Sequence, residues 1–250
     1  MVSLSFYDLD RTITRYPTFT PFLLYVAWKE ARLKLLGLPI WIGAMACYAI
    51  GLIDRKVLKQ FGFAMFVGRR LNARRAEALV RGFADWHFNG RLQPGALESL
   101  ERDRRAGRRI VLVTAAPDVY AEEFGRRLGI DDIIATCHLR EADGTILYLI
   151  DGLNCHGREK LARSLKWLRS KCISREECHV RVYSDALSDT PLLNFADEAV
   201  LVTARTKCAK IAKRSGWKPV DFAKSHSDRG ASLQKVVSTS LYLPLIVLLG

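Results

Sequence analysis

Short apolar runs alternate with amphipathic stretches along the chain. The runs lie at residues 3–7 (Ser-Leu-Ser-Phe-Tyr), 110–114 (Ile-Val-Leu-Val-Thr), 179–184 (His-Val-Arg-Val-Tyr-Ser) and 198–203 (Glu-Ala-Val-Leu-Val-Thr). Helical patterns precede the later runs, as at 95–107 and 157–170. This alternation is typical of βαβ units, in which helices connect parallel strands. We therefore predict an α/β fold with a Rossmann-like parallel sheet.

Residues 15–94 separate the first strand from the rest and have a helical pattern throughout. Between 73 and 90, apolar residues recur every three or four positions, and Gly90 provides a stop signal. The predicted core positions of this helix are Ala76, Leu79, Val80, Phe83 and either Trp86 or His87. The expected organisation is a catalytic core of 1–14 and 95–225, an all-helical insert of 15–94, and a tail of 226–250.

The stretch Leu35 to Ile53 contains no charged residue. Its length would allow it to cross a bilayer. A single crossing would leave Asp8 and Thr114 on opposite sides of the membrane, so no site could use both. Residues 19–28 form an apolar partner just before it. We therefore expect a helical hairpin that lies in the membrane interface, with packing against the protein itself as the alternative.

Charge and composition narrow the class of protein. The chain carries 39 Lys and Arg against 26 Asp and Glu, a net charge of +13, on a globular composition with 49% hydrophobic residues. Such a surface attracts nucleic acid, anionic membranes or phosphorylated substrates. Basic residues precede an apolar C-terminus at 241–250, which favours contact with anionic lipid. The six cysteines show neither zinc-site nor disulfide-framework spacing.

Polar side chains occur where the predicted strands end. Asp8 and Asp10 follow the first strand two residues apart, so both side chains point the same way and can act as nucleophile and acid/base. The later strand ends carry Thr114, Asp185 and Asp189, and Lys160 lies at the start of the helical pattern 157–170. Because the carboxyl ends of strands in an open α/β sheet face one crevice, these separated residues should meet in one site.

These motifs resemble those of the haloacid dehalogenase-like phosphatase superfamily. The matching positions are Asp8 to Thr12 for DxDx[TV], Thr114 for the strand-terminal hydroxyl, Lys160 for the lysine, and Asp185 with Asp189 for the acidic pair. The insert after the first motif is similar to the cap of the subgroup that includes phosphoserine phosphatase. The segments 6–10, 155–160 and 183–193 are similar to the phosphatidylglycerophosphatase C family.

The resemblance implies phosphoryl transfer through an aspartyl-phosphate. Asp8 would be the nucleophile, and Asp10 would protonate the leaving oxygen and then deprotonate water. Thr114 and Lys160 would hold the transferring phosphoryl group.

The acidic cluster predicts a Mg²⁺ site, because hard oxygen ligands suit this ion and it offsets the repulsion between carboxylate and phosphate. The resemblance assigns Asp8, the backbone carbonyl of Asp10 and Asp185 as direct ligands. Asp189 would bind directly or through water; its alternative is a helix N-cap.

Arg11 departs from the small residue that usually follows the second aspartate of this motif. Its guanidinium could bind phosphate, point into solvent or narrow the entrance.

Our preferred hypothesis is a Mg²⁺-dependent phosphatase acting on a phospholipid head group, such as that of phosphatidylglycerophosphate, at the cytoplasmic face of the inner membrane. The alternatives are a soluble, cytoplasmic phosphomonoesterase of phosphoserine-phosphatase type and a non-catalytic adaptor. All four motifs are intact, whereas a non-catalytic adaptor should have lost at least one, so the sequence disfavours the adaptor and we expect no nucleic-acid partner.

Overall fold

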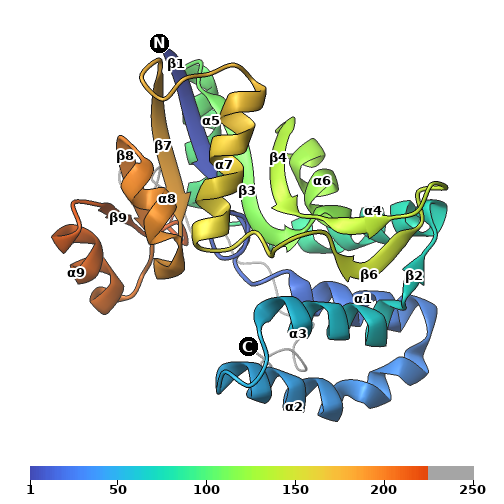
Figure 1. The fold of residues 1–250 in the computed structure, drawn as a ribbon. Helices are drawn as coiled ribbons and strands as arrows, with labels where there is room; N and C mark the ends of the chain where they lie inside the picture. Colours follow the sequence, from blue (N-terminus) through green and yellow to red (C-terminus); the bar gives the residue numbers. More distant parts are fainter. Residues whose placement is uncertain (225–250) are drawn as a thin grey trace, which may run out of the picture.

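A computed structural model describes residues 1–224, and the predicted tail of 226–250 lies outside them. The central feature is a six-stranded sheet in the order β4-β3-β1-β7-β8-β9, with every pair parallel (Figure 1). Its strands are β1 (Val2–Tyr7), β3 (Arg109–Pro117), β4 (Asp132–Thr136), β7 (Cys178–Ser184), β8 (Glu198–Val202) and β9 (Lys218–Val220). The predicted α/β fold with a parallel sheet is confirmed.

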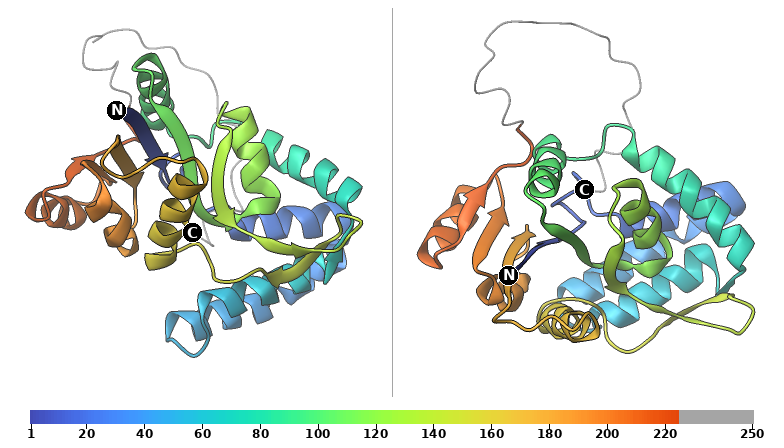
Figure 2. Two further views of the ribbon diagram at one scale, coloured as in Figure 1. Left: turned by 45° about the horizontal axis from the view of Figure 1, so that its top comes forward. Right: turned by 90° about the horizontal axis from the view of Figure 1, so that it is seen from above.

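Helices cover both faces of this sheet. They are α5 (Pro94–Arg105), α6 (Asp118–Arg127), α7 (Arg158–Ser170), the 3₁₀ turn η3 (Leu187–Asp189), α8 (Thr190–Phe195) and α9 (Thr206–Arg214). Leu4 and Phe6 of β1 belong to the same apolar cluster as Leu168 of α7, whereas Tyr7 belongs to the cluster that contains Leu100 of α5. Figure 2 shows α5 and α7 on opposite sides of the sheet. The two apolar clusters follow from the alternation of side chains along each strand.

The insert lies beyond the carboxyl ends of the strands (Figure 1). It contains α1 (Phe19–Glu30), the 3₁₀ helix η1 (Arg32–Gly37), α2 (Leu38–Ala49), α3 (Arg55–Gly62), the π-helical turn η2 (Phe63–Val67), β2 (Arg70–Leu71) and α4 (Ala73–Phe88). Its two ends are held together by a bridge between Thr14 and Leu92. The insert therefore leaves and rejoins the core at neighbouring positions.

One short strand departs from the helical pattern expected throughout the insert. Arg70 and Leu71 of β2 pair with Leu147 and Ile146 of β6 (Ile146–Ile150), which also pairs with β5 (His138–Arg140). The edge of the β5–β6 hairpin offers unpaired backbone groups, and two residues of the insert satisfy some of them.

Helix α4 packs on the core as its spacing predicts. Its buried residues are Ala76, Leu79, Val80, Phe83, Ala84 and His87, while Trp86 is half-buried. The Phe83 ring lies 5.2 Å from Phe22 of α1 and 5.5 Å from Tyr120 of α6, between ring centroids. Phe83 thus joins the insert to the core.

The insert exposes apolar side chains around α2. Trp41 is the buried residue of this helix, whereas Leu33, Leu36 and Ile50 are 81%, 78% and 72% exposed. We call the exposed set the apolar ridge: Leu33, Leu36, Ile40, Ile42, Ile50 and Leu52. Within residues 1–224, no helix has the length and apolar character needed to cross a bilayer.

The contact of Trp41 with Gly62 predicts a sharp effect on stability. A Cβ atom on Gly62 would lie 2.6 Å from the Trp41 ring and 2.7 Å from Leu23. Gly62→Ala should lower the free energy of unfolding by about 1–3 kcal/mol, because overpacking displaces neighbouring side chains. Gly43→Ala is the control, since a Cβ atom there would meet no atom of another element within 4 Å and alanine favours the helix by up to about 1 kcal/mol. Equal urea-unfolding curves for the two variants would contradict this packing.

Candidate active site

Lys160 joins three separate elements at the carboxyl edge of the sheet. Asp8 follows β1, and its backbone N–H donates to the carbonyl of Tyr183 (2.9 Å), so the end of β7 fixes its position. From the first turn of α7, Lys160 Nζ lies 2.9 Å from Asp8 Oδ1 and donates to Asp189 Oδ2 at 2.6 Å. All three side chains are buried. The structure therefore brings these predicted site residues together.

Asp189 binds the lysine rather than capping a helix. It occupies the N-cap position of α8, but its side chain makes no capping hydrogen bond. Ser184 Oγ donates to Asp189 Oδ2 at 2.7 Å, beside the Lys160 contact. Asp189 Oδ1 is buried and has no hydrogen-bond partner within the described residues. That oxygen is available to a ligand or water in the site.

Burial and mutual repulsion raise the pKa values of the acidic residues. Burial raises the pKa of Asp8 to about 7, with Lys160 opposing the shift and Asp189 adding to it. Asp185, which follows β7 and is half-buried, has its pKa raised to about 6 by burial, against the influence of Arg11. Burial opposes the charge of Lys160, but Asp8 and Asp189 outweigh it and raise the lysine pKa. The lysine stays charged and partly offsets the carboxylates.

Asp10 is held by a residue that the sequence analysis missed. Thr18 donates to Asp10 Oδ1 twice, from its backbone N–H at 2.8 Å and its hydroxyl at 2.7 Å. Tyr120 Oη lies 2.9 Å from the same hydroxyl. Burial raises the pKa of Asp10 although Thr18 opposes it. A threonine just before a helix usually predicts an N-cap, so the sequence offers no signal for this role.

Thr114 is buried within a strand that is longer than expected. The predicted strand ends at Thr114, whereas β3 continues to Pro117 with a register shift between Val113 and Pro117. This irregularity lets the chain bend around the site while the strand continues. The backbone N–H of Ala116 donates to Thr114 Oγ1 at 3.0 Å. The hydroxyl proton of Thr114 can still be donated to a phosphoryl oxygen.

A second lysine reaches the site from the insert. Lys59 of α3 is buried, and its Nζ donates to the Ala115 carbonyl and to Asn154 Oδ1 (2.6 Å). Thr136 Oγ1 lies 2.8 Å from the same carbonyl and 3.1 Å from the same amide oxygen. Burial, together with the nearby Arg55, lowers the pKa of Lys59 to about 7. Nothing in the sequence around Lys59 indicates this contact, because it depends on how α3 folds back onto the core.

The acidic residues fit a Mg²⁺ ion that retains water ligands. No group of three or more His, Cys, Asp or Glu side chains in residues 1–224 forms a protein-only metal site. Mg²⁺ commonly binds through one or two carboxylates together with water and substrate oxygens. Asp8 and Asp185 are close enough for Asp185 to raise the pKa of Asp8, and the unpartnered Asp189 Oδ1 adds a further oxygen. This donor set suits the predicted ion.

Arg11 follows Asp10 in the loop after β1 and has an unusual backbone conformation. Its φ is 58°, in the left-handed region, and its side chain is exposed. Its backbone N–H donates to Thr14 Oγ1 at 3.3 Å, and Gln93 Nε2 donates to its carbonyl. These contacts hold a conformation that usually favours glycine. Arg11 and Asp185 line a cavity of about 490 Å³.

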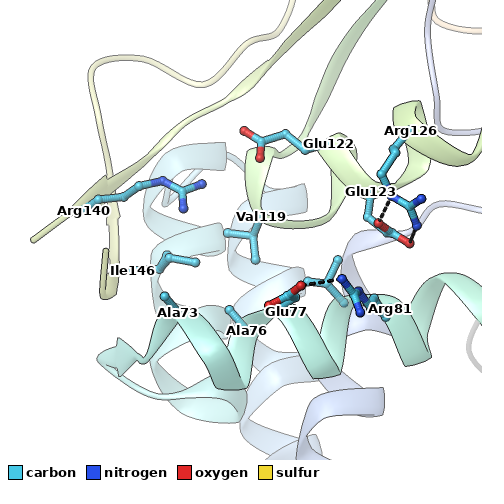
Figure 3. A pocket seen from close by; sticks show the side chains of 11 residues that line it. Ala73, Ala76, Glu77, Arg81, Val119, Glu122, Glu123, Arg126, Arg140 and Ile146 are labelled. Atoms are coloured by element: carbon cyan, nitrogen blue, oxygen red, sulfur yellow. Dashed lines mark hydrogen bonds and ion pairs between the residues drawn. The ribbon is translucent and has the colours of Figure 1, made fainter. Parts of the chain in front are cut away.

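Another cavity, of about 340 Å³, lies between α4 and α6 (Figure 3). Its charged walls include the ion pairs Glu77–Arg81 and Glu123–Arg126, at 2.5 and 2.7 Å. None of the predicted site residues lines it. This cavity is therefore separate from the predicted site residues at the sheet edge.

Residues 6–194 match the family model of the haloacid dehalogenase-like hydrolases, and the chain belongs to this family. The prediction of a hydrolytic enzyme is confirmed at this level. The chain is 31% identical over 192 residues to "Protein CicA" of Caulobacter vibrioides, a match that covers 77% of this chain and 82% of that protein.

Two solved structures are similar in fold to this chain. A protein of unknown function from Bordetella pertussis Tohama I has a TM-score of 0.79 at 20% identity, covering 89% of this chain and 99% of that one. A phospho-aspartyl intermediate analogue of phosphoserine phosphatase has a TM-score of 0.58 at 14% identity, covering 91% and 96%. These likenesses establish a shared fold.

The buried amine of Lys59 predicts a pH-dependent stability difference. The pKa of Lys59 is about 7 in the folded protein, against an ordinary value of 10.5. Between these values the unfolded chain holds the proton and the folded protein has released it, so wild-type stability rises with pH. The difference in free energy of unfolding between wild type and Lys59→Met should be constant below about pH 7. Between about pH 7 and 10 this difference should change in favour of the wild type, by on the order of a few kcal/mol.

Urea unfolding of both proteins at a series of pH values measures this difference. Lys56→Met, on the same helix, is the matched control for loss of a lysine. A Lys59→Met curve parallel to wild type across the whole range would show that the amine is not held in a desolvated position.

Proposed function

We propose that the chain is a Mg²⁺-dependent phosphatase that forms an aspartyl-phosphate on Asp8. The observation that carries the proposal is the placement of Lys160 Nζ between Asp8 and Asp189, at 2.9 and 2.6 Å, at the carboxyl edge of a parallel sheet. A buried carboxylate with an adjacent cation can serve as a nucleophile whose charge is partly balanced. The nearby Asp10 is a second carboxylate with a different environment, which suits an acid/base role.

In the first step, an oxygen of Asp8 attacks phosphorus and the bond from phosphorus to the alcohol oxygen breaks. Asp10 gives its proton to that departing oxygen, so the alcohol leaves neutral. Thr18 donates both of its hydrogen bonds to Asp10 Oδ1, which leaves Oδ2 as the oxygen that carries the proton. The raised pKa of Asp10, caused by burial, helps it hold this proton.

In the second step, Asp10 takes a proton from water, and that water attacks the phosphorus of the aspartyl-phosphate. The bond between phosphorus and Asp8 breaks, which releases inorganic phosphate and regenerates the Asp8 carboxylate. Throughout, Lys160 and the Thr114 hydroxyl hold phosphoryl oxygens, since phosphoryl transfer depends chiefly on positioning and charge stabilisation. Mg²⁺ would be held by Asp8, Asp185, the Asp10 carbonyl and, directly or through water, Asp189, and it would supply positive charge that offsets the repulsion between carboxylate and phosphate.

The apolar ridge supports a phospholipid substrate at the cytoplasmic membrane face. The ridge belongs to the same insert that contributes Lys59 to the site. Between residues 31 and 53, the charged side chains are Arg32 and Lys34, which are both basic. An apolar surface flanked by cations matches an anionic bilayer. The segments similar to phosphatidylglycerophosphatase C favour phosphatidylglycerophosphate as the substrate.

A soluble phosphomonoesterase is the second candidate. The fold shared with phosphoserine phosphatase at a TM-score of 0.58 favours it. In that case the apolar ridge would have no lipid to contact, so membrane binding separates the two candidates.

Asp8→Asn should abolish phosphatase turnover and leave the fold intact. The amide keeps the shape of the side chain but is no longer a carboxylate nucleophile, so kcat should fall by at least about a thousandfold. Release of phosphate from an aryl phosphate in Mg²⁺ measures activity, and circular dichroism checks the fold. Asp151→Asn, an exposed carboxylate after β6, is the control and should retain activity. A folded Asp8→Asn protein with substantial activity would remove the covalent mechanism.

The apolar ridge predicts binding to anionic vesicles. Co-sedimentation should increase with the fraction of anionic lipid and persist in part at high salt, because salt screens the charges but not the apolar contact. Leu36→Ser combined with Ile40→Ser should reduce binding about tenfold or more. Leu97→Ser on α5, also exposed and apolar, is the control. Wild-type protein that stays in the supernatant at every lipid composition would favour the soluble phosphomonoesterase.

A further inference from the structure

The cavity of about 490 Å³ adjoins the reaction centre on the side of β8 and β9. Asp185 lines it, as do Arg11 from the loop after β1 and Arg205 at the start of α9. About half of its lining is apolar or small, including Leu187, Val202 and Ala204. It therefore combines room for an organic group with two guanidinium groups, next to a carboxylate of the site.

Neither arginine has an ion-pair partner within the described residues. Arg11 interacts electrostatically with Asp185, but no side-chain hydrogen bond or ion pair fixes its guanidinium. Arg205 is exposed, and its backbone N–H donates to Thr203 Oγ1 at 3.0 Å. Many other arginines of this chain pair with carboxylates, for example Arg181 with Asp103 at 2.6 Å. The two guanidinium groups at the cavity thus retain donors for an anion.

Helix α9 reinforces the positive character of this cavity. Arg205 is its N-cap residue, no side chain caps its first turn, and that turn contains no acidic residue. A helix N-terminus normally attracts negative charge, because its first N–H groups lack partners and its dipole is positive there. Placing Arg205 at this end is unfavourable unless a negative group lies nearby.

The acidic residues of the cavity do not supply that group. Asp185 is a predicted Mg²⁺ ligand and would be neutralised by the ion. Asp221 accepts a hydrogen bond from the Ala223 N–H at 3.0 Å and lies 3.8 Å from Lys224 Nζ. Asp221 therefore has other partners, and Asp185, although it interacts electrostatically with Arg11, would be engaged by the ion.

We propose that Arg11 and Arg205 form a second anion subsite, which binds an additional anionic oxygen group on the alcohol part of the substrate. The proposal rests on the phosphatase function and narrows its substrate class to phosphomonoesters that carry a second negative group, such as a phosphodiester. A planar guanidinium group can donate two parallel hydrogen bonds to two oxygens of one phosphate group, so arginine suits the binding of a second anionic group. The half-apolar wall accommodates the carbon chain between the two groups.

Two soluble substrates test the subsite in the full-length protein. Glycerophosphoryl-glycerophosphate carries a phosphomonoester and a phosphodiester, whereas glycerol 3-phosphate has the same monoester end and no second anion. The measured quantity is the ratio of kcat/KM for the first substrate to kcat/KM for the second. Arg205→Gln should lower this ratio about tenfold, mainly through KM, and Arg205→Lys should recover part of the loss. Arg214→Gln, at the opposite end of α9 and also exposed, should leave the ratio unchanged.

The outcomes separate this subsite from the proposed function. If wild type hydrolyses both substrates and Arg205→Gln keeps the wild-type ratio, the subsite is wrong and the phosphatase stands. Arg205→Gln could also weaken inhibition by inorganic phosphate by the same factor by which it lowers kcat/KM for the doubly anionic substrate. In that case the cavity binds free phosphate, and the assignment to the alcohol part of the substrate is overturned. If wild type hydrolyses no phosphomonoester in Mg²⁺, the proposed function fails, and the subsite fails with it.

Discussion

The buried ammonium of Lys160 is the constraint on which the site depends. Three carboxylates, Asp8, Asp185 and Asp189, gather at one edge of the sheet, where burial raises the pKa of Asp8 to about 7. Removing one partner from a buried charged group is strongly destabilising, so lysine and carboxylates must be kept together. Lys160 contacts Asp8 and Asp189 at once and so fixes the start of α7 against the ends of β1 and β7. The contact that joins these elements is therefore also the one on which the proposed chemistry relies.

The insert contributes further polar groups to this site. Thr18 holds Asp10 at 2.7 and 2.8 Å, and Lys59 donates to the carbonyl that follows Thr114. Both groups are buried, so the insert limits the access of water to the reaction centre as well as contributing polar contacts. The same insert carries the apolar ridge. The proposed membrane contact would therefore involve the same structural unit that contributes Thr18 and Lys59 to the site.

Much of the fold follows from the sequence because its central strands are short segments rich in apolar and β-branched residues that alternate with amphipathic helices. β1, β3, β7 and β8 lie where those runs predict, and α4 buries His87 rather than Trp86 from its predicted alternatives. The short strands β2, β4, β5, β6 and β9 were not predicted. Polar residues occupy much of β5 and a proline lies in β9, whereas β6 is an uninterrupted apolar run whose pairing with the insert depends on tertiary contacts. Asp8 and Asp189 were expected to meet because strand ends share one edge, and Lys160 was expected to join them from the start of a helix. Thr18, Lys59 and Asn154 could not be found this way, because their contacts depend on how the insert packs on the core.

Trapping phosphate on Asp8 tests the central claim most directly. The Asp10→Asn protein should be mixed with an aryl phosphate, whose leaving group needs no proton, so that the first step proceeds while activation of water is impaired. After rapid acid quenching, proteolysis and mass spectrometry locate the modified residue. The account predicts one added phosphoryl group on the peptide that contains Asp8, and its absence in the Asp8→Asn Asp10→Asn double variant. Release of the aryl alcohol with no phosphorylated peptide, or with the phosphoryl group on another residue, would contradict it.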